Sequence, residues 1–287
     1  MFLKKSILFL IIFTLLSQLT FSQWTRDKGK GYYKISGWYL QSDQHYTDTG
    51  DIDPNATRSY FNLSFYGLYG ISKKVNLIGY IPFFSRTVQN DIVSGTTGET
   101  LMPGEAVNAI GDIDIGIIYS LLNKNNWALS ATLKLGLPTG EDEGGNNGSF
   151  QTGDGEFNQL LQLNLGRSLT IFKNSAYAKA YVGFNNRSNG FSDELKLGAE
   201  LGIKFFNKLF IIPRSKVNLS LNNGSLNAQN AQGNIFANNV EYVNMGVGGL
   251  YYITKKFGVS LGFDSAVSGR IIAANPSFSA GLFLDIK

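Results

Sequence analysis

The 287-residue chain contains no cysteine, which excludes disulfide bonds, thiolate metal sites, a cysteine nucleophile and a lipid-modified cysteine. Its single histidine, His45, excludes a metal centre built from several histidines. Charged residues make up only 16% of the chain, and 25 basic against 21 acidic side chains leave a net charge of +4 without a clustered basic stripe. No nucleic-acid partner is therefore expected.

Long apolar runs are also scarce, and the clearest one, residues 6–16, follows two lysines near the N-terminus. This run is shorter than the roughly 20 residues that a membrane-spanning helix needs, and polar and small residues follow it. Such an arrangement is typical of a secretory signal peptide. We predict that residues 1–22 are a signal peptide and that residues 23–287 form a single domain.

In place of long apolar runs, the chain alternates apolar with polar or small side chains. Residues 127–137 carry apolar side chains at the odd positions, and residues 113–121 and 195–205 repeat this two-residue period. The pattern predicts about twelve strands of roughly 10 to 14 residues each, which is long for a soluble sheet and suits an oblique crossing of a bilayer. The strands are expected at 30–41, 58–71, 75–87, 111–122, 127–138, 157–169, 175–186, 193–206, 209–221, 239–254, 257–267 and 276–286.

The connections between these strands alternate in length. Short links that contain lysine lie at 72–74, 123–126, 172–174, 207–208 and 254–256. Long loops rich in Gly, Asn, Asp and Ser lie at 42–57, 88–110, 139–156, 187–192, 222–238 and 268–275. This alternation is typical of outer-membrane barrels, in which the short turns and both termini are periplasmic.

We therefore predict an all-β fold, a transmembrane antiparallel up-and-down β-barrel of about twelve strands after a cleaved signal peptide. The protein would be a monomer surrounded by the lipid of the outer membrane of a Gram-negative-type bacterium. A secreted β-sandwich or lipocalin-like barrel would also alternate, but its outer face would carry more lysine and glutamate. Aromatic residues near many strand ends favour the membrane barrel, since they resemble interface girdles.

If the fully apolar parity of each strand faces lipid, the other parity lines the lumen. A charge that faces lipid near mid-membrane costs about 2–4 kcal/mol, so charged side chains are expected inside. About twelve strands predict a narrow passage, which tyrosines on the inward parity would narrow further. The predicted pore-lining residues are Asp112, Asp114, Lys134, Lys179, Lys196, Glu200, Lys204, Arg214, Lys216, Tyr66, Tyr177 and Tyr181.

Few residues support covalent chemistry. A barrel lipid hydrolase would need a serine and a histidine base, for which Ser42 and His45 are the candidates, and we expect His45 to be a solvent-exposed loop residue instead. The acidic loop segments 51–55 and 141–143 match no calcium-loop pattern, and no glycine cluster precedes a helix in a phosphate-binding arrangement. We predict no catalytic residue, no cofactor and no bound metal.

Three stretches carry a resemblance to a known family. They are Gly111-Asp112 at the start of an alternating strand, Pro138-Thr139-Gly140 at the end of the next, and Thr152-Gly153 before the one after. The chain resembles, most clearly over about 105–170, the outer-membrane barrel family named for the meta-pathway of phenol degradation. The resemblance implies a channel or transporter for small hydrophobic or aromatic compounds. It supplies no catalytic residue, and the terminal Lys287 departs from the aromatic residue common at that position.

Two other functions remain open from the sequence. The barrel could be a structural or surface-interaction protein with a blocked lumen, or it could be the lipid hydrolase considered above. A channel predicts conductance that depends on charges such as Lys134, whereas the hydrolase predicts esterase activity that depends on His45.

Overall fold

The computed structural model describes residues 25–146, 148–227 and 233–287. The described residues form strands and the loops between them, and they contain no helix. The signal peptide predicted for residues 1–22 lies outside the described residues. Among the residues that the structure covers, no helix is long and apolar enough to cross a membrane.

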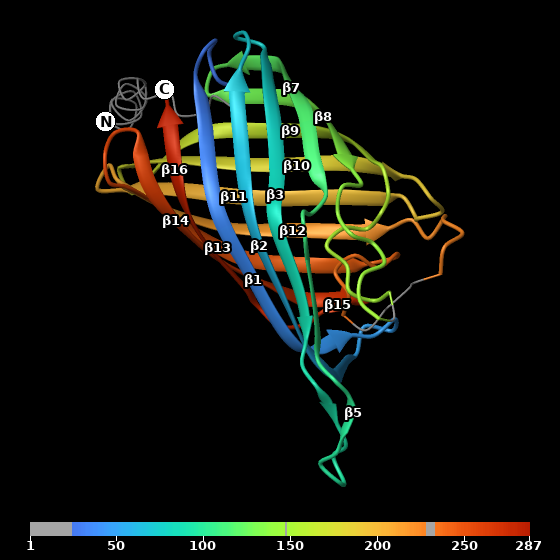
Figure 1. Ribbon diagram of the computed structural model, residues 1–287. Coiled ribbons are helices and arrows are strands. Elements are labelled where there is room, and N and C mark those ends of the chain that lie inside the picture. Colours follow the sequence, from blue (N-terminus) through green and yellow to red (C-terminus); the bar gives the residue numbers. More distant parts are fainter. Residues whose placement is uncertain (1–24, 147, 228–232) are drawn as a thin grey trace, which may run out of the picture.

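Twelve long strands of 10 to 19 residues follow one another along the chain and form the wall of a barrel (Figure 1). This number confirms the expected one. The strands are β1 (Gly31–Tyr46), β2 (Ile52–Gly70), β3 (Val75–Gln89), β7 (Ile113–Lys124), β8 (Trp127–Leu137), β9 (Asn158–Ile171), β10 (Asn174–Arg187), β11 (Glu194–Phe205), β12 (Leu209–Ser220), β13 (Glu241–Tyr252), β14 (Phe257–Arg270) and β16 (Ser277–Ile286).

The sheet closes on itself because the first and last long strands pair. Each strand is antiparallel to its sequence neighbour, and β1 pairs with both β2 and β16. The closing ladder runs from Gly31 opposite Ile286 to Leu40 opposite Ser277, so the start of β1 and the end of β16 lie at the same rim. Closure satisfies the backbone hydrogen bonds of every strand and leaves no long edge.

The short turns at that rim fit the twist of the strands. Asn125 and Asn126, with φ of 54° and 67°, connect β7 to β8, and Phe172 and Lys173, with φ of 48° and 65°, connect β9 to β10. Two consecutive positive φ angles define a type I′ turn, the hairpin connection that matches the right-handed twist of strands. Asparagine tolerates this conformation well, whereas a phenylalanine in it is strained.

Two of the expected long loops are wrong in part. β1 continues to Tyr46 and β2 begins at Ile52, so most of the loop predicted at 42–57 is strand, with a bulge near Ser42 where the register shifts. The loop predicted at 88–110 contains β4 (Ile92–Val93), β5 (Thr100–Met102) and β6 (Glu105–Ala109), and β4 pairs with β5 in a hairpin that projects from the barrel (Figure 1). Another short strand, β15 (Ile272–Ala273), pairs with β1. The extensions of β1 and β2 could not be recognised in the sequence, because polar residues within 42–57 interrupt the apolar–polar alternation.

The outward face of the barrel is apolar. Side chains such as Ile35, Leu133, Leu161, Leu163 and Leu282 are about half exposed although they sit in the middle of strands. A contiguous band of exposed leucine and isoleucine would be unfavourable in water and is suited to lipid. The polar and charged side chains of the same strands point inward, where two cavities lie between them.

Candidate functional site: the lumen

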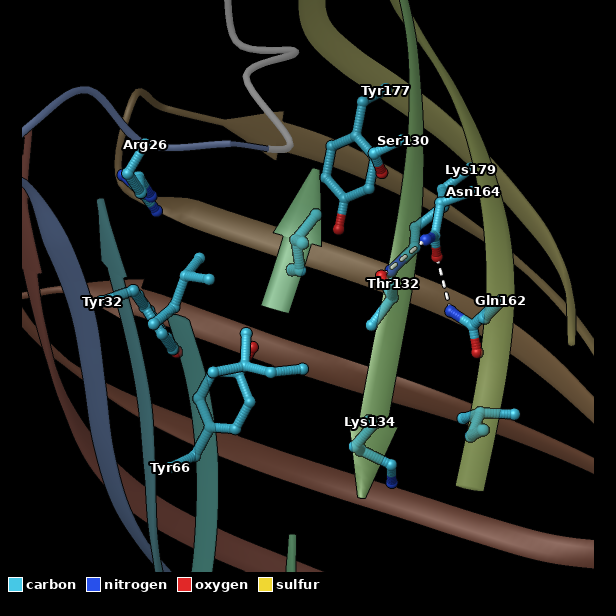
Figure 2. A pocket seen from close by; sticks show the side chains of 14 residues that line it. Arg26, Tyr32, Tyr66, Ser130, Thr132, Lys134, Gln162, Asn164, Tyr177 and Lys179 are labelled. Carbon is cyan, nitrogen blue, oxygen red and sulfur yellow. Dashed lines mark hydrogen bonds between the residues drawn. The ribbon is translucent and has the colours of Figure 1, made fainter. Parts of the chain in front are cut away.

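The inner cavity has a volume of about 480 Å³ and lies toward the rim of the short turns (Figure 2). Seven strands of the wall contribute to it, together with the segment that precedes β1. Figure 2 shows the side chains converging on one space from opposite sides of the barrel. The cavity is lined by Arg26, Tyr32, Tyr66, Leu68, Ile78, Ile118, Ser130, Thr132, Lys134, Leu160, Gln162, Asn164, Tyr177 and Lys179.

The polar wall of the inner cavity is an ordered ladder on β8 and β9. The side-chain amide of Gln162 donates to Oδ1 of Asn164 at 2.6 Å, and Nδ2 of Asn164 donates to Oγ1 of Thr132 at 3.1 Å (Figure 2). These residues face the lumen because they share the even parity of adjacent antiparallel strands. The ladder presents amide and hydroxyl groups to any solute in the cavity.

A second, outer cavity of about 250 Å³ lies toward the long loops. Lys134 and Leu160 line both cavities, so the two spaces meet at these side chains. The outer cavity is otherwise lined by Asp114, Asp154, Asn158, Asn185, Arg187, Glu194, Lys196, Asn218, Ile235, Phe236, Ala237, Val240 and Tyr242. The lumen therefore contains two spaces in series.

The loop of residues 233–240, here called the roof, covers the outer cavity. Ile235 and Phe236 of the roof pack against the buried cluster of Leu40, Tyr60 and Ala273. Ala237 and Val240 form a second cluster with Ile271. The roof is thus held inside the mouth of the barrel by apolar contacts with strands from both sides of the closing seam.

The residue Arg26 occupies the inner end of the lumen. Its guanidinium donates to Oδ1 of Asp285 on β16 at 2.7 Å, and its backbone N–H donates to Oδ1 of Asn76 on β3 at 3.1 Å. Asp285 and Asn76 are buried, and Tyr252 also donates to Asp285 at 2.7 Å. These contacts hold the segment before β1 at the inner opening, against β16 and β3, which flank β1 and β2 in the sheet. Sequence reasoning missed Arg26 because it precedes the first alternating segment.

Between the two ends, ion pairs lie along the inner wall of the barrel, within one strand or between strands close together in the sheet. Nζ of Lys134 lies 2.7 Å from Oδ2 of Asp114, and Nζ of Lys196 lies 2.8 Å from Oε2 of Glu194. Arg214 on β12 reaches across β13 to make a two-bond pair with Asp264 on β14. The position between them is Gly246, where a side chain would collide with the Asp264 carboxylate.

Arg187, at the end of β10, gathers three carboxylates at the outer rim. Its guanidinium lies 2.6 Å from Glu156, 2.9 Å from Asp154 and 3.4 Å from Glu194, and it stacks on Phe191. Arg187 is 5% exposed and Glu156 is fully buried. Burial raises the pKa of Asp154 to about 6, although the charge of Arg187 opposes the change. Burial also raises the pKa of Glu156, against the same opposing charge.

The three stretches that carry the family resemblance meet in space and form what we call the loop latch. Asp112 accepts hydrogen bonds from the backbone N–H groups of Gly140, at 2.9 Å, and Asp154, at 2.8 Å. Thr139 and Thr152 donate to carbonyl oxygens of the segment before β7, at Gly111 and Ile110. Gly153 lies where any side chain would collide with the Asp112 carboxylate. These motifs therefore position the loop of residues 138–157 at the outer rim.

The structure brings some of the predicted pore-lining residues together and separates others. Tyr66, Tyr177, Lys134 and Lys179 line the inner cavity, and Asp114 and Lys196 line the outer one. Asp112 lines neither cavity and belongs to the loop latch. The remaining predicted residues share the inward parity of their strands without lining either cavity: Tyr181, Glu200, Lys204, Arg214 and Lys216.

The expectation that His45 is an exposed loop residue is wrong. His45 lies in β1, is 7% exposed, and its Nδ1 has no hydrogen-bond partner. The hydroxyl of Ser42 lies 2.5 Å from the carbonyl oxygen of Gln44 and 2.8 Å from Oδ1 of Asn275. The serine is thus engaged by other groups, and among the described residues it makes no hydrogen bond to His45, the pairing that a serine nucleophile needs. In the part of the chain that the structure covers, no three His, Asp or Glu side chains are placed to hold a metal ion.

Comparison with known proteins supports the fold. No protein-family model and no curated protein matches the chain. Among solved structures, an outer-membrane channel from Pseudomonas putida F1 matches with a TM-score of 0.58 and 13% identity over 91% of this chain and 96% of that one. The KdgM porin matches with a TM-score of 0.49 and 7% identity over 89% and 99% of the two chains. The first of these matches, together with the closed sheet, shows that the chain has the fold of outer-membrane β-barrels, while the resemblance to the phenol meta-pathway family stays a prediction.

Proposed function

We propose that this chain is a monomeric channel of the outer membrane of a Gram-negative-type bacterium and that small solutes, aromatic or hydrophobic ones among them, pass through its lumen. The observation that carries the proposal is the pair of cavities in series inside a closed barrel, joined at Lys134 and Leu160. A barrel of few strands can fill its interior with side chains, so retained space in line with the axis suits passage.

Different lining residues would contact the apolar, polar and charged parts of a solute. Tyr66 and Tyr177 offer ring faces to an apolar or aromatic solute, and the ladder of Gln162, Asn164 and Thr132 offers hydrogen bonds in place of water. Lys134, at the junction of the cavities, lies on the path that any solute would follow. Its charge therefore influences which ions pass.

A structural barrel with a blocked lumen is the second candidate, and one observation favours it. The roof lines the outer cavity and packs on the barrel wall, and Arg26 is held at the inner opening by Asp285 and Asn76. In a channel one or both of these closures must move, whereas in a structural barrel both stay in place. The two functions therefore differ in what happens when a closure is removed.

The test is ionic current across a planar bilayer that contains the refolded chain without residues 1–22. A difference in gel mobility between unheated and boiled samples establishes that the barrel has folded. The variants are Lys134→Glu, a roof variant that combines Ile235→Gly with Phe236→Gly, and Lys208→Glu as a matched control, because Lys208 is exposed in a turn outside the lumen.

The channel predicts discrete conductance steps in the unaltered chain and a change in ion preference toward cations for Lys134→Glu but not for Lys208→Glu. A folded barrel that stays silent, and conducts when the roof is altered, would support the blocked lumen. A folded barrel that stays silent in every variant would contradict the channel.

A further inference from the structure

The inner cavity has a basic wall. Three of its lining residues, Arg26, Lys134 and Lys179, are basic, and none is acidic. Arg26 pairs with Asp285 and Lys134 pairs with Asp114, and neither carboxylate is part of the cavity wall. A solute in the cavity therefore meets the cationic ends of these pairs directly.

The surrounding lumen adds to the positive field. Beside the cavity, inward positions of four strands carry Lys34, Arg214 and Lys216 against Glu200 and Asp264. The outer cavity is different, because Asp114, Asp154 and Glu194 line it together with Lys134, Arg187 and Lys196. An excess of one sign inside low-dielectric walls attracts ions of the other sign and raises their local concentration.

The rest of the inner wall suits a flat apolar body with a polar edge. Tyr32, Tyr66 and Tyr177 come from three strands and face the same space as Ser130, Thr132 and Gln162 (Figure 2). Tyrosine rings pack on apolar or aromatic groups, and charge-assisted hydrogen bonds from lysine and arginine are stronger than neutral ones. The wall thus combines cations, ring faces and hydrogen-bonding groups within about 480 Å³.

We propose that the inner cavity is a binding site for a small organic anion, attracted by the positive charges that Arg26, Lys134 and Lys179 place around the cavity, with its apolar body against the tyrosine rings. This inference rests on the proposed channel function and names the class of its solute. The outer cavity, whose charges are mixed, admits the solute without holding it.

The test compares three probes that share a benzyl or phenyl body and differ in charge: benzoate, benzyl alcohol and benzylamine. Equilibrium dialysis of the detergent-solubilised, folded chain without residues 1–22 measures the binding of each probe at pH 7. The variants are Lys179→Gln and Lys134→Gln, with Lys179→Arg to retain the charge and Lys208→Gln as the control. The current through bilayers under a salt gradient gives the ion preference of the same samples.

Benzoate is expected to bind more tightly than the other two probes. Lys179→Gln and Lys134→Gln are each expected to weaken benzoate binding by about tenfold, since a hydrogen bond to a charged group contributes on that scale. Lys208→Gln should bind benzoate as the unaltered chain does, and Lys179→Arg, which keeps the charge, should weaken benzoate binding less than Lys179→Gln does. The reversal potential should show a preference for anions that the two glutamine variants reduce.

Equal binding of the three probes, or benzoate binding that neither glutamine variant weakens, would overturn the inference. If such a barrel still conducts, the channel function stands and only the solute class is wrong. If the folded barrel is silent but binds benzoate through Lys179, the site is real and the proposed passage fails. If one of the two glutamine variants shows no difference in gel mobility between unheated and boiled samples, it has not folded. The other glutamine variant then provides the comparison.

Discussion

Removal of the Arg187 guanidinium should destabilise the barrel strongly. Arg187 is 5% exposed and contacts the carboxylates of Glu156, Asp154 and Glu194 at 2.6, 2.9 and 3.4 Å. Arg187→Gln leaves these three carboxylates close together without their shared cation. Breaking a buried ion pair from one side costs about 3–5 kcal/mol, because the remaining charge stays buried without its partner.

The expected loss lies at the lower end of this range, about 3 kcal/mol, since the carboxylates keep other donors. The backbone N–H of Ser188 donates to Glu156 at 2.8 Å, and Lys196 and Asn218 contact Glu194 at 2.8 and 2.9 Å. Adding Glu156→Gln to Arg187→Gln removes one unpaired charge. The double variant should therefore regain at least about 1 kcal/mol relative to Arg187→Gln.

The assay is urea unfolding of the barrel in lipid vesicles, followed by the fluorescence of the three tryptophans of the chain, of which Trp38 lies on β1 and Trp127 on β8. Arg86→Gln is the matched control, because Arg86 is exposed and bonds to Asn108 on the short strand β6. The control should stay within about 0.5 kcal/mol of the unaltered chain. If the unfolding free energy of Arg187→Gln lay within about 1 kcal/mol of that of the unaltered chain, Arg187 would not be the cation on which the three buried carboxylates depend.

Three further predictions concern the lipid face, the turns and the outer rim. Leu133→Lys, on the outward face of β8, should lower the unfolding free energy in vesicles by about 2–4 kcal/mol. Ser130→Lys, on the lumen face of the same strand, should lower the unfolding free energy by less, and equal losses would contradict the assigned faces. Phe172→Asn should raise that free energy by about 1 kcal/mol because asparagine tolerates the positive φ better; a decrease would mean that the exposed ring anchors the turn at the membrane surface. The carboxyl of Asp154 should titrate with a midpoint near pH 6 in infrared spectra, with the signal absent in Asp154→Asn. Because this pKa is raised above its ordinary value, the folded state holds a proton that the unfolded state releases. The stability that this protonation contributes is therefore lost as the pH rises from about 4 through 6. The direction would be contradicted if, over this window, the unfolding free energy of the unaltered chain rose relative to that of Asp154→Asn.

The sequence by itself determined the wall of the barrel. The two-residue period of segments such as residues 127–137 assigns each side chain to one face, since successive residues of a strand point to opposite sides. The number of strands and the positions of the short turns follow from where this alternation stops. The lengths of β1 and β2 were underestimated because the polar residues of 42–57 obscure the alternation, and the short strands within 88–110 were missed.

The tertiary structure alone decided what fills the lumen. Arg26 contacts Asp285 across 259 positions of sequence, and Ile235 of the roof packs on Tyr60, because closure of the barrel brings these segments to the same ends. The inner cavity likewise has a basic wall because Arg26 and Lys134 line it, whereas their acidic partners, Asp285 and Asp114, do not. Alternation is a local property of the backbone, whereas cavities, closures and charge clusters depend on contacts between distant strands, which no period in the sequence encodes.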